Sequence, residues 1–490
     1  MTPINLNIYL FVLVVVIFII FGLSASRRQK SVKDYFHDES LPKNVVSLTA
    51  TNITLGTGLV YLVTGAQHNG LLMLVVPFMM CLGYFLQGEF IEKATSISMR
   101  TGKNMLASIN EQIERLTYMK SPFAVIISGS LVVIFVLILA FEIFASSKVI
   151  VPFLFKTPDV SAEIWLSVII FVITVVYTLL GGITAVFRVD ALQIPLVLIF
   201  LPVFLIVTVP DLDSPQILFR KVISTIKFDS SVVAAIAIAS INSITTQFYS
   251  LLNWGAVSHV ELSNQKRLLR WVGAASAIIT AIFVIVGLLH SVEPGQQVWQ
   301  DITVKYSLIA SQTGLNAYLF SCILLLGMSS ILLTTTDAVV ITAIMFWYDN
   351  IARGNSKNAK NDPNELRKIR RIGVITFSLC FIILIILNYF QPDPFYLLLS
   401  MAGGVVVFAP MIVTAGFLSS KGDSLRIFKP NIIYTYFVIF LFAGGLNILM
   451  LAVKSPMVAY IGVSAFLVSI IYSLILIFKA QKWKLGFPLT

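Results

Sequence analysis

The chain has 490 residues, of which 58% are hydrophobic and only 12% are charged. A typical soluble domain carries about 25% charged residues. This composition, with a mean hydropathy of +0.92, excludes an ordinary soluble enzyme, a disordered chain and a secreted disulfide scaffold. It predicts an all-α polytopic membrane protein. The net charge of +11 favours either a nucleic-acid partner or an excess of basic residues on the cytoplasmic side.

Apolar stretches long enough to cross a bilayer recur along the whole chain. Each crossing needs about 20 mostly apolar residues. We expect 1–490 to form one transmembrane domain with thirteen transmembrane helices, near 5–24, 44–68, 70–92, 121–147, 160–181, 184–209, 231–257, 271–291, 314–347, 372–390, 395–418, 431–452 and 457–478.

The positions of the basic residues predict the orientation. No Lys or Arg precedes the first apolar stretch, whereas Arg27, Arg28 and Lys30 follow it, unlike a signal peptide. With the N-terminus outside, an odd number of spans places the C-terminus in the cytoplasm. The cytoplasmic segments then hold 27 of the 34 Lys and Arg residues, as the positive-inside rule requires. We therefore expect a multi-pass protein of the plasma (inner) membrane, and the charge requires no nucleic acid.

Two of the spans carry polar residues at membrane depth. The second span contains Thr, Asn and Gly residues between Leu48 and Gly58, and the seventh contains Ser, Asn, Thr and Gln residues between Ser240 and Gln247. Transporters use such discontinuous helices for solute and ion sites. The alternative is ordinary helix packing, since Gly, Ser and Thr are common at helix interfaces in membranes.

The register of the two polar runs predicts an internal repeat. Spans two to six (about 44–209) and seven to eleven (about 231–418) would form two five-helix repeats of inverted topology, each starting with a broken helix. The spans 5–24, 431–452 and 457–478 would then be peripheral.

Carboxylates inside spans are costly and are candidates for function. Among the carboxylates within the expected spans, we single out Glu89, Glu142, Asp190 and Asp337. Asp190 has the alternative of pairing with Arg188 or with interfacial water, Glu89 suits the interface, and Glu142 has no assigned role. No phosphate-binding loop, zinc motif or nucleophile elbow occurs, so we do not expect an enzyme.

Three stretches resemble the sodium/solute symporter family. They are Asp34-Tyr-Phe with Ser40-Leu-Pro and Ala50-Thr-Asn-Ile-Thr, the run Gly181-Gly-Ile-Thr-Ala-Val-Phe-Arg-Val-Asp-Ala-Leu-Gln, and Thr334-Thr-Thr-Asp running to Tyr348-Asp-Asn-Ile. The chain departs from the family at two places. The family often has Gly-Arg where this chain has Asp38-Glu39. Its seventh span often carries Thr-Asp-Gln and Gln-Arg, which the stretch from Gln247 to Trp254 matches at most loosely. The resemblance implies the leucine-transporter type of inverted-repeat fold.

The resemblance also implies a coupling ion, Na⁺, and no organic cofactor. The first sodium site would use backbone carbonyls and hydroxyls of Ala50, Ile53, Ile331, Thr334 and Thr335, which are the oxygen ligands that hard cations prefer. Some relatives hold a second ion, and here its ligands would be Asp190, Thr334 and Asp337.

The solute is expected to be a small organic molecule. Positions that are polar in sugar-carrying relatives correspond here to Leu55, Gly56 and Val76. This argues against a hexose and leaves amino acids, carboxylates, nucleobase-like compounds and other small metabolites. The positive ends of half-helices favour an anionic group on the solute. The residues expected to line its site are Asn52, Thr54, Gly56, Asn242, Ser243, Thr246 and Gln247.

These expectations predict a sodium-coupled symporter that works by alternating access, as a monomer in the bilayer. Two alternatives stay open. One is a solute-sensing receptor built on a transporter-like module, and the other is the same fold coupled to protons through Asp190 or Asp337.

Overall fold

The computed structural model describes residues 3–27, 49, 54–101, 105–155, 159–208, 228–249, 262–290, 298–312, 314–348, 350, 363–419, 422–453, 455 and 457–484. Within these residues every regular element is a helix, as the composition predicts. The residues Ala50, Asn52 and Ile53, which were expected at the ion and solute sites, lie outside the described part.

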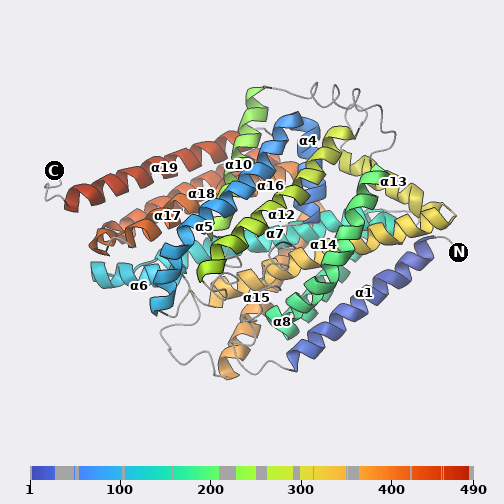
Figure 1. Cartoon of the computed structure of the whole chain (residues 1–490), viewed down its shortest axis with the longest axis horizontal. Helices are drawn as coiled ribbons and strands as arrows, with labels where there is room; N and C mark the ends of the chain where they lie inside the picture. Colours follow the sequence, from blue (N-terminus) through green and yellow to red (C-terminus); the bar gives the residue numbers. More distant parts are fainter. Residues whose placement is uncertain are drawn as a thin grey trace.

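The helices form an elongated bundle (Figure 1). In chain order they are α1 (Pro3–Ser26), η1 (Leu55–Leu62), α4 (Val63–Asn69), η2 (Gly70–Leu74), α5 (Val75–Thr101), α6 (Met105–Thr117), α7 (Phe123–Leu154), α8 (Val160–Thr208), α10 (Ser230–Tyr249), α12 (Leu262–Leu289), α13 (Val298–Ser311), α14 (Leu315–Trp347), α15 (Pro363–Phe390), α16 (Pro394–Val405), α17 (Phe408–Ser419), η5 (Gly422–Ile427), α18 (Pro430–Ala452) and α19 (Met457–Lys484).

The apolar helices support an integral membrane protein. Eleven helical stretches of the described chain are long and apolar enough to cross a membrane. One of them, Gly58–Phe90, includes the last part of the second expected span and nearly all of the third. The sixth expected span corresponds to a shorter apolar helix, Gln193–Thr208. The exact number of thirteen spans is therefore not confirmed.

The stretch Gly58–Phe90 consists of two segments that run in opposite directions along α12. The chain turns at Gly70, whose φ is +65°. Along η1 and α4, residue numbers increase in the same direction as along α12, because Gly58 lies beside Phe283 and Val63 lies beside Gly287. Along α5 they increase in the opposite direction, because Met80 lies beside Thr280 and Glu89 lies beside Lys266.

Helix α8 also reverses direction, at Gly182 (φ +51°, ψ −154°). Both of its ends lie at the end of the bundle where α13 packs. Near its start, Glu163 bonds to Lys148 of α7 at 2.8 Å, and at its end the carbonyl of Thr208 lies 2.6 Å from the Nδ1 atom of His290. Helix α13 contacts both regions. The ring of its Tyr306 packs against Phe153 of α7, and its Asp301 bonds to His290.

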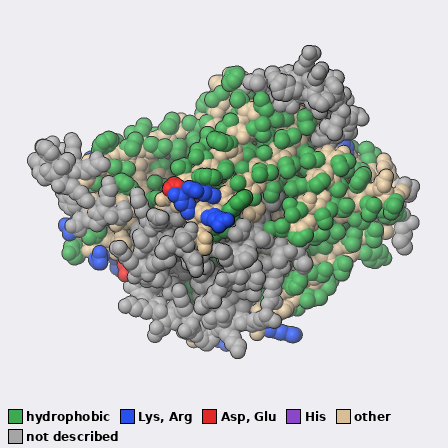
Figure 2. Space-filling view, viewed as in Figure 1, with side chains coloured by type: hydrophobic (Ala, Val, Ile, Leu, Met, Phe, Trp, Pro, Cys, Tyr) green, Lys and Arg blue, Asp and Glu red, His purple; other side chains and the backbone are tan. Residues whose placement is uncertain are grey.

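The degree of burial separates inner from outer helices. The apolar windows of α7, α14 and the α16–α17 pair are 61%, 65% and 72% buried, against 22% for α1, 22% for α18 and 28% for α19. Large apolar side chains remain exposed on the outside, among them Trp165, Phe442 and Phe478. Figure 2 shows hydrophobic side chains covering most of the described surface on one face. Such a surface suits lipid, since soluble monomers rarely expose large apolar patches.

Candidate functional site

The backbone is irregular where the second span was expected to break. Thr54 is not helical, and the segment that follows it, η1, is a π-helix of eight residues. The N–H group of Gly58 donates to the carbonyl of Thr54 at 2.9 Å, which is a helical hydrogen bond at the start of η1. π-Helical turns are rare and frequently occur at functional sites. Thr54, an expected solute-lining residue, thus stands at the start of a half-helix.

Gly56 contacts a carboxylate from another helix. Its backbone N–H donates a hydrogen bond of 2.8 Å to the Oε2 atom of Glu142 in α7. The Glu142 side chain is fully buried (0% exposed). Gly56 itself was expected to line the solute site, whereas Glu142 had no assigned role. The structure brings these two residues together.

The absence of a side chain at Gly56 allows this close approach. A Cβ atom on this residue would lie 2.6 Å from the ring of Phe141 and 2.9 Å from the carboxyl carbon of Glu142. Real Cβ atoms do not come this close to other heavy atoms. The glycine therefore lets the start of η1 pack directly on α7.

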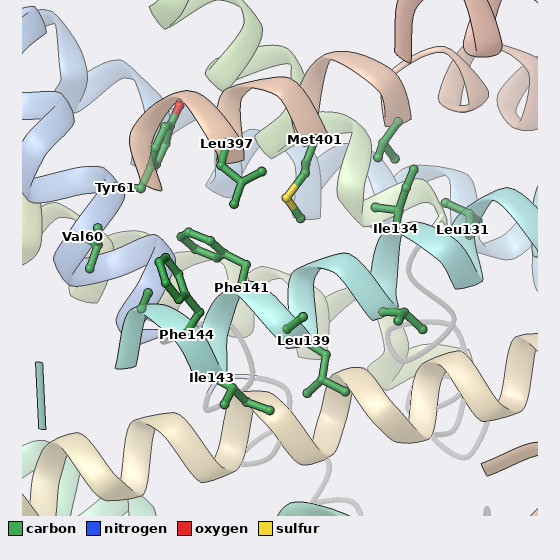
Figure 3. Close-up of a cluster of buried hydrophobic side chains, with 14 of the residues drawn as sticks. Val60, Tyr61, Leu131, Ile134, Leu139, Phe141, Ile143, Phe144, Leu397 and Met401 are labelled. Carbon is green, nitrogen blue, oxygen red and sulfur yellow. The ribbon is translucent and has the colours of Figure 1, made fainter. Parts of the chain in front are cut away.

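Apolar side chains surround this contact between η1 and α7. Phe141 and Phe144 of α7 lie near Val60 and Tyr61 of η1, and Leu397 of α16 lies across from Phe141 (Figure 3). Helices α12 and α14 also contact η1. The irregular segment is thus enclosed by protein, as required for non-helical backbone at membrane depth.

Helix α14 carries two described residues of the set predicted to bind the first sodium ion, Ile331 and Thr335. The carbonyl oxygen of Ile331 accepts a hydrogen bond of 3.0 Å from the hydroxyl of Thr335, and these residues are 1% and 2% exposed. Two of the five expected ligand groups are therefore buried oxygen atoms side by side, the chemistry that Na⁺ accepts. The side chain of Thr334 lies outside the described part, as do Ala50 and Ile53.

One turn further along α14, Asp337 is fully buried (0% exposed). Its Oδ2 atom accepts a hydrogen bond of 2.8 Å from the hydroxyl of Tyr177 in α8. The hydroxyl oxygen of the neighbouring Thr336 lies 3.4 Å from the hydroxyl oxygen of Thr174. The side chain of Asp190, the third expected ligand of the second ion, lies outside the described part. Of the three side chains expected to bind the second ion, only Asp337 lies in the described part, where it is bonded to Tyr177.

The break that was expected between Ser240 and Gln247 is wrong. These residues lie inside α10, an uninterrupted α-helix. Three of their polar side chains bond to carbonyls four residues earlier in the same helix, and such bonds do not break a helix. The bonds are Ser243 Oγ to Ala239 O, Thr246 Oγ1 to Asn242 O, and Gln247 Nε2 to Ser243 O, at 2.9, 2.7 and 3.2 Å.

The same stretch of α10 packs closely on α5. A Cβ atom on Gly83 of α5 would lie 2.8 Å from the Cα atom of Ile244 and 3.0 Å from the side chain of Gln247. Gln247 is 3% exposed. Ile244 and Gln247 of this polar run thus take part in helix packing, which was the alternative to a broken helix. Whether Asn242, Ser243, Thr246 and Gln247 also face a solute stays a prediction.

Sequence reasoning missed Tyr177 and gave no role to Glu142. A tyrosine inside an apolar span resembles a core residue, and only its partner 160 positions away marks it. Glu142 carried a usable signal, because a carboxylate in mid-span is costly. Its partner could not be inferred, since Gly56 lies 86 residues earlier.

The amino-acid sequence matches no protein-family model and no curated protein. Solved structures are similar in shape. A Na⁺-coupled sialic acid symporter in a substrate-bound, outward-open state aligns with 96% of this chain and 98% of its own, with a TM-score of 0.67 and 14% identity. A manganese transporter of Eremococcus coleocola aligns with 91% of this chain and 95% of its own, with a TM-score of 0.48 and 13% identity. The chain has the fold of the sialic acid symporter along almost its whole length.

Proposed function

We propose that the protein is a sodium-coupled secondary active symporter that imports a small organic solute by alternating access. The observation that carries this proposal is the irregular start of η1, buried in protein beside α7 and in contact with α14. Discontinuous helices of this kind form the solute and ion sites of secondary transporters. The likeness to a structure described as a Na⁺-coupled symporter supports sodium as the coupling ion.

The first sodium ion would bind between the break and α14. Its ligands would be oxygens of Ala50, Ile53, Ile331, Thr334 and Thr335. The buried carbonyl of Ile331 and hydroxyl of Thr335 support this assignment, since neither brings a charge into the membrane. A second ion would bind at Asp190, Thr334 and Asp337, where the buried Asp337 would supply the negative charge.

The solute would bind next to the break, in contact with Asn52, Thr54 and Gly56, and with the polar residues of α10. An amino acid, a carboxylate or a similar metabolite suits this site better than a hexose. Val76, which aligns with a polar position in sugar carriers, is a buried apolar residue. A hexose would leave hydroxyls unpaired there, at a cost of about 1–3 kcal/mol for each buried group.

The energetics favour coupling. One positive charge that moves inward across about 100 mV releases about 2.3 kcal/mol. This alone supports roughly 50-fold accumulation of a neutral solute. The orientation that we propose, with the N-terminus outside and the C-terminus in the cytoplasm of a plasma membrane, makes this movement an import.

Proton coupling is the second candidate, because Asp337 is a buried carboxylate with a hydroxyl partner. Uptake into proteoliposomes separates the two candidates. Labelled amino acids, monocarboxylates and glucose are offered under inward gradients of either Na⁺ or H⁺ at equal membrane potential. Accumulation of an amino acid or a carboxylate only with Na⁺ is expected. Accumulation driven only by H⁺ would replace the sodium proposal, and no accumulation under either gradient would contradict both.

A further inference from the structure

The buried carboxylate of Glu142 lies beside the break, and the proposed ion sites do not use it. Glu142 belongs to α7 and is fully buried. Its Oε2 atom accepts the N–H of Gly56 at 2.8 Å, and its Oε1 atom would lie 2.9 Å from a Cβ on the same residue. Both carboxylate oxygens are therefore directed at the first residues of η1.

These first residues form the positive end of a half-helix. The N–H groups at a helix start have no partner within the helix, and the helix dipole adds a partial positive charge there. The bond from Gly58 to Thr54 places the N–H of Gly56 before the regular bonds begin. In transporters with discontinuous helices, such an end commonly holds an anionic group of the solute. Here a side chain of the protein already accepts the hydrogen bond.

A fixed carboxylate at this position changes which solutes are favoured. A solute carboxylate would have to displace Glu142 or bind beside it, where two negative charges repel each other strongly in a medium of low dielectric constant. A positively charged group is attracted there instead.

The aromatic ring of Phe141 lies against Gly56 on the same side as the Glu142 carboxylate. The nearest lysine along α7, Lys148, bonds to Glu163 at 2.8 Å and to Gln391 at 2.5 Å, at the end of the bundle.

We propose that Glu142 determines the charge of the transported solute, and that the site takes a compound whose ammonium group lies next to this carboxylate. The inference rests on the proposed function, because it requires a solute site at the break. It narrows that function to amines and amino acids and excludes solutes whose only charged group is a carboxylate. It also reverses the expectation that this half-helix would favour an anionic solute.

The test uses matched ligands on the purified full-length protein in the presence of Na⁺. Butylamine, 1-butanol and butyrate differ at one group, and glycine and alanine carry both charges. Ligands that bind the folded state raise its melting temperature by mass action. We expect the ammonium compounds to raise the melting temperature, and butyrate and butanol to leave it unchanged. Stabilisation by butyrate equal to that by the ammonium compounds would overturn the inference, as would no stabilisation by any ammonium compound.

The variant Glu142→Gln keeps the shape of the side chain and an oxygen that accepts the Gly56 N–H, so it is expected to fold. We expect it to lose at least tenfold in affinity for the ammonium compounds and to gain affinity for butyrate. The matched control is Glu163→Gln, which removes a carboxylate that pairs with α7 at the end of the bundle and should leave both affinities within twofold. A purely structural role for Glu142 would lower the melting temperature of Glu142→Gln without changing its selectivity, and would overturn the inference.

Failure of this inference is distinguishable from failure of the proposed function. If Glu142→Gln leaves selectivity unchanged while uptake into proteoliposomes still depends on a Na⁺ gradient, the symporter proposal stands and the role of Glu142 is wrong. If the wild-type protein binds ammonium compounds but no Na⁺ gradient drives their uptake, the sodium-coupled function is wrong and the selectivity stands.

Discussion

The hydroxyl of Tyr177 donates a hydrogen bond of 2.8 Å to the carboxylate of Asp337. The same oxygen lies 3.1 Å from the carbonyl of Leu333. Tyr177 and Asp337 are both fully buried, and their bond joins α8 to α14. Because burial of a charged group without compensation is costly, this bond stabilises the folded protein and fixes the direction of the carboxylate.

The variant Tyr177→Phe is expected to lower stability. It removes a hydrogen bond to a carboxylate, which contributes about 1.5–3 kcal/mol. Thermal unfolding of the purified protein measures the loss. The control is Tyr306→Phe, because Tyr306 is also fully buried but its hydroxyl has no hydrogen-bond partner among the described residues. Equal melting temperatures for the two variants would contradict this account of Asp337.

The variant Gly56→Ala is expected to disrupt the packing of η1 on α7. The new methyl group would lie 2.6 Å from the Phe141 ring, and overpacking of this kind typically costs about 1–3 kcal/mol. Gly129 of α7 is the control, since a Cβ there meets nothing within 4 Å among the described residues. Gly129→Ala should be neutral or should stabilise the helix by up to about 1 kcal/mol. A Gly56→Ala protein as stable as Gly129→Ala would show that η1 does not press on α7.

The variant Gly182→Ala tests the reversal of α8. The backbone angles there (φ +51°, ψ −154°) lie in a region that is used almost only by glycine, and other residues in such regions cost about 1–3 kcal/mol. We expect a lower melting temperature and a lower yield of folded protein in membranes. A stability unchanged from wild type would mean that the chain turns differently at this point.

Much of the architecture was predictable because hydropathy reports directly on burial in lipid. The irregular backbone after Thr54 was also predictable. Thr, Asn and Gly residues within an apolar span indicate either close helix packing or a binding site. The same argument failed for α10. There the side chains of Ser243, Thr246 and Gln247 bond to their own helix, so polar residues alone do not indicate a break.

The contacts within the candidate site were not predictable from local pattern. Glu142 meets Gly56, and Tyr177 meets Asp337, across 86 and 160 residues of chain. Such pairs depend on how the helices pack and on the reversal at Gly182. Composition and spacing identified Gly56 and Asp337 as candidates, but they could not identify the partners that determine the chemistry of these residues.

Binding of ²²Na⁺ to the purified protein tests the central claim most directly, because it needs no knowledge of the solute. The informative variant is Thr335→Ala, which removes a buried hydroxyl 3.0 Å from the Ile331 carbonyl. Its control is Thr376→Ala in α15, where an equally buried hydroxyl bonds to the Ile372 carbonyl at 2.9 Å, so both variants lose the same kind of helix bond.

The account predicts saturable ²²Na⁺ binding by the wild-type protein and by Thr376→Ala, and at least a tenfold loss of affinity in Thr335→Ala. Saturable binding that is equally strong in both variants would contradict the proposed ion site. Absence of saturable ²²Na⁺ binding in the wild-type protein would contradict sodium coupling itself.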